Sequence, residues 1–311
     1  MRIGSRGSAL ALVQAQQVAA LLDGAEVRAI QTSGDSGPAA APADKSRWVD
    51  AIEQALLSGE VDLAVHSAKD LPCALPQGLV LLGTLARAPA EDVLCGAAGL
   101  AALPPGARVG TSSLRRKAQL LAARPDLEVL PLRGNVETRL ARLAGKAPAP
   151  HGALDAIVLA QAGLLRLELA AAGVALELER FVPSPGQGAL ALEAREDDEA
   201  VAAAVAGLTD ERAFACLLAE RSLARALDAG CHTPLGAHAR HVDGGALALR
   251  AWTGLPDGST WIGDDALAQS GEDAEALGLR LAKRMRAVGA AELLAAAELL
   301  AEAGMQAEVE A

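Results

Sequence analysis

Short apolar runs alternate with longer stretches rich in alanine and leucine through about residue 195 of the chain. The short runs have the length of buried strands, and the longer stretches repeat their apolar residues at helical spacing. The predicted strands are residues 2–6, 61–66, 93–95, 107–110, 128–132 and 156–159, and the predicted helices are 9–22, 48–57, 114–123 and 136–143. Because strands and helices alternate in this way, the pattern predicts an α/β fold.

The pattern changes at Glu211. A predicted helix runs to about residue 228, a loop with glycine and cysteine follows, and two short strands lie near 246–252 and 260–262. A long helix rich in alanine, leucine and glutamate is predicted from there to the end, so we expect a separate α+β domain. Two stretches rich in glycine, proline and alanine, 33–44 and 147–152, are predicted to be loops, the first of them mobile.

Composition limits the partners that the chain could have. Its 311 residues give room for two or three domains. Although 51% of the residues are hydrophobic, no uninterrupted apolar run approaches the ~20 residues of a membrane span, so we expect no membrane contact. The net charge is −11, with no Tyr, two Phe and three Trp. This is the opposite of a basic groove with stacking aromatic residues, and no nucleic-acid partner is expected.

The cysteines and histidines give no sign of a disulfide framework or a metal site. The cysteines are Cys73, Cys95, Cys216 and Cys231. They form no CxxC pair and their spacing is irregular. His238 and His241 are three residues apart without an evident third ligand, so no metal is expected. Because the amino-terminal residues also lack the apolar segment of a secretory signal, we expect a reduced, cytoplasmic protein.

Cations gather where predicted strands end and predicted helices begin. Ser113 is positioned to cap the helix that starts at Leu114. The first turn of this helix holds three cations, Arg115, Arg116 and Lys117. Positive charge at this position opposes the helix macrodipole, whose amino-terminal end attracts anions. The junction therefore predicts a bound anion, held by backbone N–H groups and guanidinium groups.

Two more junctions have the same arrangement. Arg6 precedes the cap residue Ser8, and Arg133 precedes the cap residue Asn135, with Arg139 one turn later. Residues 110–142 contain seven Lys and Arg against three Asp and Glu, inside an acidic protein. Open α/β sheets bind ligands where strands end and helices begin, so the three junctions together favour an anion site. Because neither GxxxxGK[ST] nor GxGxxG is present, nucleotide phosphate is not the expected anion.

Two further motifs carry chemistry. Lys69 and Asp70 follow the predicted strand 61–66 and would place a cation and an acid–base group at its end. A Lys–Asp pair in a loop is more often only solvated. Cys231 lies in a loop bounded by glycine and proline, where an accessible thiol could act as a nucleophile or an attachment point. A lone cysteine is more often a small buried hydrophobic residue.

Eight segments carry a resemblance to a known family. In order, they are RIGSRGSALAL, VDLAVHSAKDLP, VGTSSLRRKAQL, LRGNVETRLARL, LAQAGLLRL, PGQGALALE, AERSLARAL and AGCHTPLG. They cover most of the chain to about residue 255, and GTSSLRR with LRGNVxTR is a very specific combination. In these segments the chain closely resembles the porphobilinogen deaminase (hydroxymethylbilane synthase) family.

This resemblance implies a fold and an activity. Two α/β domains would resemble the halves of a type-II periplasmic-binding-protein fold, and a third, α+β domain would follow. We expect the first at 1–86 plus 189–206, the second at 91–183 and the third at 211–311. The implied activity is that of a transferase in tetrapyrrole (haem) biosynthesis. It joins four porphobilinogen units head to tail, with loss of ammonia, into linear hydroxymethylbilane. Family members are typically monomers.

The resemblance also implies a dipyrromethane cofactor, built from porphobilinogen and joined to Cys231 by a thioether. Residues at family positions for cofactor binding are Ser8, Lys69, Asp70, Ser113, Arg115 and Arg116. Residues at positions for substrate binding are Arg6, Arg133, Arg139, Arg166 and Gln187. Each pyrrole unit carries an acetate and a propionate, and bidentate pairing with carboxylates explains why arginine predominates over lysine.

Asp70 matches the catalytic aspartate of the family. A fixed carboxylate there would stabilise the cation left by the loss of ammonia and shuttle the proton released in the next condensation. Lys45 and Trp48 align with a lid lysine and with an aromatic residue that packs over the cofactor. The lid glycines of the family, in segments of the type GGKGLF, are absent here, and His232 stands where another polar residue is common.

Two other interpretations stay open at this stage. The two-lobed fold is shared with solute receptors, so the chain could bind small anions without catalysis. A degenerate family member with an altered lid is the other possibility. The lack of a secretory signal, together with Asp70 and Cys231, favours the enzyme.

Overall fold

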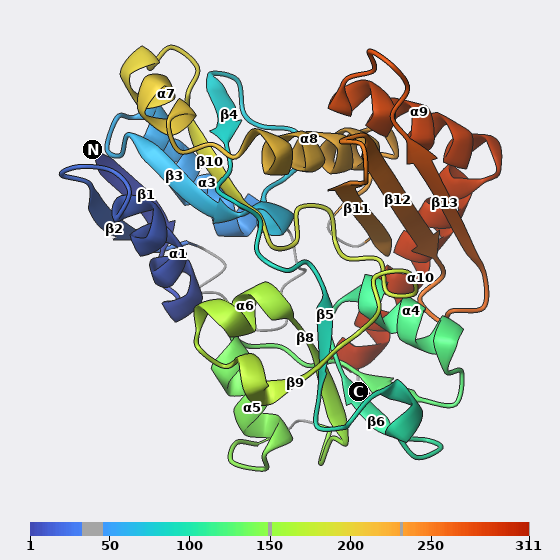
Figure 1. Cartoon of the computed structure of the whole chain (residues 1–311). Helices are drawn as coiled ribbons and strands as arrows, with labels where there is room; N and C mark the ends of the chain where they lie inside the picture. Colours follow the sequence, from blue (N-terminus) through green and yellow to red (C-terminus); the bar gives the residue numbers. More distant parts are fainter. Residues whose placement is uncertain (33–45, 149–150, 231–232, 311) are drawn as a thin grey trace.

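The computed structural model describes residues 1–32, 46–148, 151–230 and 233–310. Its helices and strands are organised around three sheets (Figure 1). No helix in these residues has the length and apolar composition needed to cross a membrane. The predicted mobile loop 33–44 lies outside the described residues, as do two residues of the predicted loop 147–152.

The first sheet has five strands in the order β2-β1-β3-β10-β4. Its strands are β1 (Arg2–Arg6), β2 (Glu26–Ile30), β3 (Leu63–Ser67), β4 (Leu79–Gly83) and β10 (Leu190–Arg195), and its helices are α1 (Ala9–Ala19), α3 (Ser46–Leu57) and α7 (Glu199–Ala206). Strand β1 is parallel to β2 and β3, whereas β10 runs antiparallel between β3 and β4. Side chains of β3 alternate between the two faces. Val65 belongs to the core that includes Val18 of α1, and Ala64 to the core that includes Ile52 of α3.

The second sheet follows the same plan, in the order β7-β6-β8-β5-β9. Its strands are β5 (Asp92–Cys95), β6 (Arg108–Gly110), β7 (Glu128–Leu130), β8 (Ala156–Ala160) and β9 (Gly173–Ala175), and its helices are α4 (Leu114–Ala123), α5 (Val136–Leu143) and α6 (Gln161–Arg166). Single 3-10 turns occur at Leu100–Ala102 and Ala170–Ala172. Strand β6 is parallel to β7 and β8, and β5 is antiparallel to β8 and β9.

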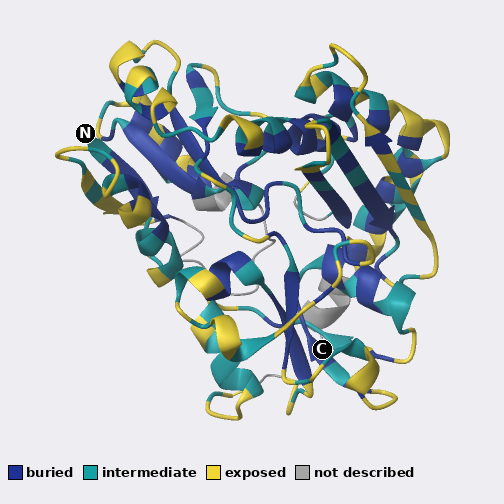
Figure 2. Cartoon of the chain, viewed as in Figure 1, coloured by how far each residue is buried: buried dark blue, intermediate teal, exposed yellow. Residues whose placement is uncertain are grey.

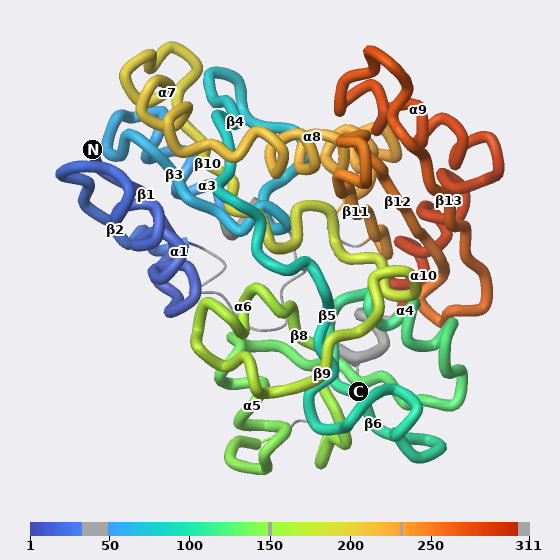
Figure 3. The backbone as a smooth tube through the Cα atoms, in the orientation of Figure 1, coloured from blue at the N-terminus to red at the C-terminus, as the bar shows by residue number. Residues whose placement is uncertain are grey.

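The chain crosses between these two sheets twice, from β4 to β5 and back from β9 to β10, as Figure 3 shows. The crossing segments lie side by side. The N–H of Ala88 donates to the carbonyl oxygen of Gly188 at 3.3 Å, and Nε2 of Gln187 donates to the carbonyl oxygen of Ala90 at 2.6 Å. Strand β10 belongs to the first sheet but follows the strands of the second sheet along the chain. Both crossing segments therefore connect the two sheets at this point.

The third group has an antiparallel sheet, β11-β12-β13. Its elements are α8 (Glu211–Ala226), β11 (Leu235–His241), β12 (Leu247–Gly254), β13 (Trp261–Leu267), α9 (Ala274–Ala287) and α10 (Ala290–Glu310). Helices α8 and α9 pack on the sheet through a shared core that includes Leu223, Leu249 and Leu281. Figure 2 colours many residues of α8, β11 and β12 as buried.

The predicted fold class, two α/β parts followed by an α+β part, is confirmed. The domain boundaries given above stay predictions. Several details were wrong. The single long carboxy-terminal helix is two helices, because Gly289 adopts φ +94 and ends the first of them. The third sheet has three strands, not two. The missed strand is β11, which contains His238 and His241.

The sequence prediction also missed strands β2, β4, β9 and β10. The segment LALEAR of β10 has the alanine, leucine and glutamate content of a helix. It is a strand because both of its edges find partners, β3 and β4, with five of its six residues buried. Tertiary pairing overrides local propensity here.

Candidate active site

The Lys69–Asp70 pair sits on a single 3-10 turn, Ala68–Asp70, that directly follows β3. The second crossing segment holds this turn in place. The N–H of Ala68 donates to the carbonyl oxygen of Ala189 at 3.1 Å. Gly186 approaches so closely, with φ +74, that a Cβ there would lie 2.9 Å from the Ala68 backbone. The crossing between the two sheets therefore fixes where Lys69 and Asp70 lie.

Asp70 lines a cavity of about 60 Å³ at the ends of β1 and β3. The polar residues of its lining are Arg6, Ser8, Gln14, His66, Ser67 and Asp70. Ser8 is the predicted cap of α1, and its hydroxyl accepts from the N–H of Ala11 at 3.4 Å. Gln14 of α1 donates to the Ser67 hydroxyl at 2.8 Å. Three residues predicted from the sequence, Arg6, Ser8 and Asp70, thus meet around one space.

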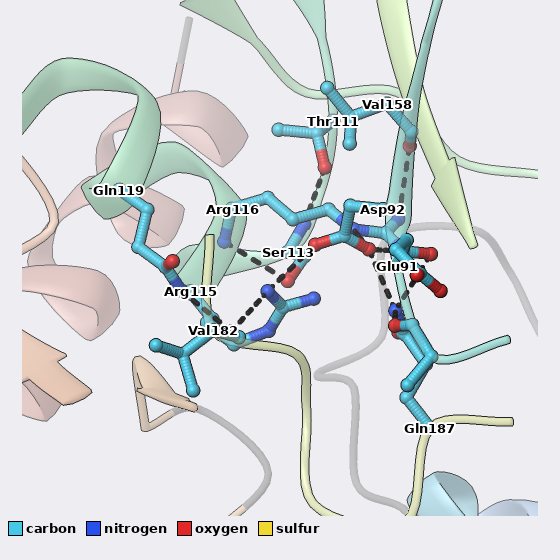
Figure 4. A network of polar contacts seen from close by, with 11 residues as sticks. Glu91, Asp92, Thr111, Ser113, Arg115, Arg116, Gln119, Val158, Val182 and Gln187 are labelled. Atoms are coloured by element: carbon cyan, nitrogen blue, oxygen red, sulfur yellow. Dashed lines mark hydrogen bonds and ion pairs between the residues drawn. The ribbon is translucent and has the colours of Figure 1, made fainter. Parts of the chain in front are cut away.

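Arg115 and Arg116 occupy the first turn of α4, which Ser113 caps as predicted. Both arginines bind Asp92, the first residue of β5 (Figure 4). Nη1 of Arg115 is 2.7 Å from Oδ2 of Asp92, and Nε and Nη2 of Arg116 are 3.0 and 2.8 Å from Oδ1. Nε2 of Gln187 donates to the same Oδ1 at 2.9 Å. The sequence analysis predicted an external anion from the positive charge of this turn. Part of that charge is neutralised instead by Asp92, a carboxylate of the protein itself.

Asp92 is buried among these donors, with 1% of its side chain exposed. Burial alone would raise its pKa, but the charges of Arg115 and Arg116 and the hydrogen bonds from Arg115 and Gln187 outweigh burial and hold the pKa well below the usual range. Carbonyl groups orient the arginines further. Arg115 donates to the carbonyl oxygen of Val182 at 2.8 Å, and Arg116 to that of Val158 at 3.0 Å. Asp92 is therefore ionised and sets the direction of both guanidinium groups.

Lys69 and Arg139 lie within electrostatic range of this cluster. Burial lowers the pKa of Lys69 to about 8, with Asp70 opposing this and Arg116 adding to it. Burial and the charge of Arg116 lower the pKa of Arg139 to about 10, and Asp70 again opposes the shift. Four cations, from Lys69, Arg139 and the two α4 arginines, thus gather around the carboxylates of Asp70 and Asp92. Such an excess of positive charge on buried and partly buried side chains favours an anionic ligand.

Arg166, Arg139 and Gln187 each donate to backbone carbonyl groups. Nη2 of Arg166, at the end of α6, donates to the carbonyl oxygen of Gly188 at 2.9 Å, and burial lowers the pKa of Arg166 to about 10. Nε of Arg139 donates to the carbonyl oxygen of Gly134 at 2.7 Å. Arg133 precedes Asn135, the cap of α5. Gln187 is 1% exposed, and its amide nitrogen donates to the carbonyl oxygen of Ala90 and to Oδ1 of Asp92.

Lys45, Cys231 and His232 lie outside the described residues, and Trp48 lies in α3. The chain just after Cys231 is described. Gly236 packs so closely on Val182 that a Cβ would lie 2.6 Å from the Val182 carbonyl oxygen, which also accepts from Arg115.

Asp92 and Gln119 were missed by sequence reasoning. Nε2 of Gln119 donates to the Val182 carbonyl oxygen at 2.9 Å, beside Arg115. A usable signal existed for Asp92, because a lone carboxylate opens the otherwise apolar strand Asp92–Cys95. A buried acid in such a place needs a cationic partner. Nothing local indicates that the partners come from α4.

We predict that Asp92→Asn destabilises the protein by about 3–5 kcal/mol, because it leaves two buried guanidinium groups without their carboxylate. Urea unfolding followed by circular dichroism measures this change. The matched control is Asp126→Asn, which removes a carboxylate from a solvent-exposed pair with Arg124 and should change stability far less. Equal stability losses in the two variants would contradict the role given to Asp92.

The fold and this geometry define a class of protein. Its members have two linked α/β domains and an α+β domain, and their cationic cluster, with a carboxylate beside it, can bind a multiply charged anion. Comparisons with known proteins narrow the class. The family described as porphobilinogen deaminase, dipyromethane cofactor binding domain, matches residues 1–203, and its C-terminal domain matches 214–287. The chain belongs to the porphobilinogen deaminase family.

Individual relatives agree over nearly the full length. The porphobilinogen deaminase of Thermus thermophilus is 44% identical over 302 residues, which cover 94% of this chain and 97% of that protein. The porphobilinogen deaminase of Xanthomonas euvesicatoria is 46% identical, covering 95% and 98%. Among solved structures, a periplasmic substrate-binding protein of an ABC transporter from Coxiella burnetii has a TM-score of 0.41. It is 14% identical and covers 71% of this chain and 96% of that one. A similarity of this size supports no argument about function.

Proposed function

We propose that this protein is a hydroxymethylbilane synthase. It joins four porphobilinogen molecules head to tail, releases one ammonia for each, and forms linear hydroxymethylbilane. The observation that carries the proposal is the meeting of the Lys69–Asp70 turn from the first sheet with Arg115 and Arg116 from the second, in a chain of this family. We further propose that it acts as a monomer in the cytoplasm.

The cationic residues would hold the carboxylates of the growing chain. Every pyrrole unit adds an acetate and a propionate, so each condensation adds about two negative charges. We assign this binding to Arg6, Arg133, Arg139 and Arg166, because guanidinium groups pair with carboxylates in bidentate fashion. Gln187 has one buried polar atom, Oε1, without a hydrogen-bond partner among the described residues. That atom is an acceptor, so its substrate partner would be a pyrrole N–H.

The residues present fit a dipyrromethane cofactor. Nε of Arg115 is buried and has no hydrogen-bond partner among the described residues. An orphaned guanidinium N–H beside Lys69 and Arg116 suits a carboxylate of such a group. We propose that Lys69, Ser113, Arg115, Arg116 and Ser8 hold it, with Asp70 beside its rings. Joined to Cys231, it would supply the ring carbon to which the first substrate is added.

Asp70 would carry out the acid–base chemistry. Loss of ammonia from the aminomethyl group of porphobilinogen leaves a cation, which a fixed carboxylate in a partly buried site stabilises. The same carboxylate then takes the proton that a ring carbon gives up when the new bond forms. Lys45 and Trp48 are proposed to belong to a lid over this site.

The test is turnover of porphobilinogen by the purified protein. We expect one ammonia for each porphobilinogen consumed and a linear tetrapyrrole product, identified by mass spectrometry. A protein that only binds small anions would bind porphobilinogen without consuming it. That result, obtained with protein that carries its cofactor, would refute the proposed activity.

A further inference from the structure

A histidine and a glutamate are buried together next to the proposed catalytic carboxylate. His66 on β3 and Glu193 on β10 come from neighbouring antiparallel strands. Nε2 of His66 is 3.0 Å from Oε2 of Glu193, and the two side chains are 3% and 0% exposed. The contact has ion-pair distance without full hydrogen-bond alignment, and neither oxygen of Glu193 accepts a hydrogen bond from any described residue. The imidazole is therefore the group that compensates this buried carboxylate.

His66 also borders the cavity that Asp70 lines. A cavity of about 60 Å³ with several polar walls has room for a few water molecules. His66 thus lies between a buried carboxylate and a space shared with Asp70. In hydrolases, a carboxylate behind an imidazole keeps the hydrogen on the near nitrogen and leaves the far nitrogen free to accept a proton.

Other charged groups face this pair from the elements packed around it. They include Glu53 on α3 and Arg221 on α8, which both interact with Glu193, and Arg6 and Asp70 at the cavity. Burial, followed by the charges of Glu193 and Asp50, raises the pKa of Glu53 to about 7. Glu53 is therefore partly protonated near neutral pH, which reduces the negative charge that it places near Glu193.

Resting on the proposed function, we propose that His66 is a proton acceptor for Asp70 and that Glu193 is the positioning residue that fixes the tautomer of His66. Glu193 holds the hydrogen on Nε2, so Nδ1 is the nitrogen that accepts a proton from the cavity. Neither residue was selected by the sequence analysis for a role in the reaction.

Each condensation releases one proton, and the proposed role of His66 and Glu193 is to remove that proton from Asp70. A carbon–carbon bond forms at a pyrrole ring carbon, and the carbon–nitrogen bond to ammonia breaks with its electron pair on nitrogen. The ring carbon loses one proton, which Asp70 accepts. A water in the cavity passes that proton from Asp70 to Nδ1 of His66, and the imidazolium later releases it through the same cavity. Asp70 is then ionised for the next of the four condensations.

The test compares Glu193→Gln and His66→Gln with the wild-type, cofactor-loaded protein. We expect ¹⁵N NMR of the wild type to place the His66 hydrogen on Nε2, and Glu193→Gln to give a mixture of tautomers. We expect kcat to fall about 10²-fold in His66→Gln, as for loss of a positioned acid–base group, with little change in KM. Glu193→Gln should lower kcat at least tenfold. The control is His238→Gln, a histidine on β11, which should leave both constants unchanged.

Wild-type kcat in His66→Gln, or a His66 hydrogen on Nδ1 in the wild type, would overturn the proposal. If Glu193→Gln does not fold, the proposal is tested by the ¹⁵N NMR spectrum of the wild type and by kcat of His66→Gln. An unchanged kcat in His66→Gln together with a raised KM would indicate a role in binding only and would also overturn it. If the wild type consumed no porphobilinogen, the proposed function would fail on its own, because the tautomer is measured without substrate.

Discussion

Cys231→Ser is expected to yield a protein without any covalent addition and without porphobilinogen turnover. A serine hydroxyl is not ionised near neutral pH and is a far weaker nucleophile than a thiol, so no stable link to the dipyrromethane forms. Intact-protein mass spectrometry of freshly purified protein measures this directly. The wild type should exceed its sequence mass by one dipyrromethane, and the variant should match its own sequence mass.

The other cysteines provide the controls. Burial raises the pKa of Cys95 to about 11, and burial with the charge of Glu220 raises that of Cys216 to about 11, so both thiols stay protonated and enclosed. Cys73 is less buried. Cys73→Ser should therefore keep the added mass and the activity. An addition that disappears in Cys73→Ser and persists in Cys231→Ser would show that the attachment site was assigned wrongly.

Asp70→Asn is expected to reduce kcat by at least ~10²-fold, the usual contribution of a positioned acid–base group. Asparagine keeps the shape of the side chain on the Ala68–Asp70 turn but can neither accept the proton nor balance the cation. Steady-state kinetics on protein whose added mass has been verified separates this effect from failure to acquire the cofactor. Single-turnover measurements should show the same loss in the chemical step.

Asp23→Asn is the matched control, because Asp23 is exposed and lies between α1 and β2, away from the cavity. It should leave kcat and KM unchanged. An Asp70→Asn protein that carries its cofactor and turns over at the wild-type rate would remove Asp70 from the acid–base role. The group responsible would then have to be sought among the other residues that line the cavity.

Much of the local structure follows from short sequence patterns. Ser8, Ser113 and Asn135 are caps of α1, α4 and α5, as predicted, because a cap depends only on a side-chain oxygen two or three residues before the N–H that it accepts. The Lys69–Asp70 pair follows a buried strand, as expected from the apolar run before it. The family resemblance extended these predictions to an activity, because its motifs are specific.

The tertiary structure decided the rest. Strand β10 could not be recognised from LALEAR, since only its pairing with β3 and β4 makes it a strand. The partner of Arg115 and Arg116 is Asp92, on a different element, and Glu193 reaches His66 only because β10 returns from the second sheet. Composition and local spacing therefore determined the caps, the strand ends and the types of charge available. Which charges meet was determined by the two chain crossings, because electrostatic partners depend on distance in space and not on separation along the chain.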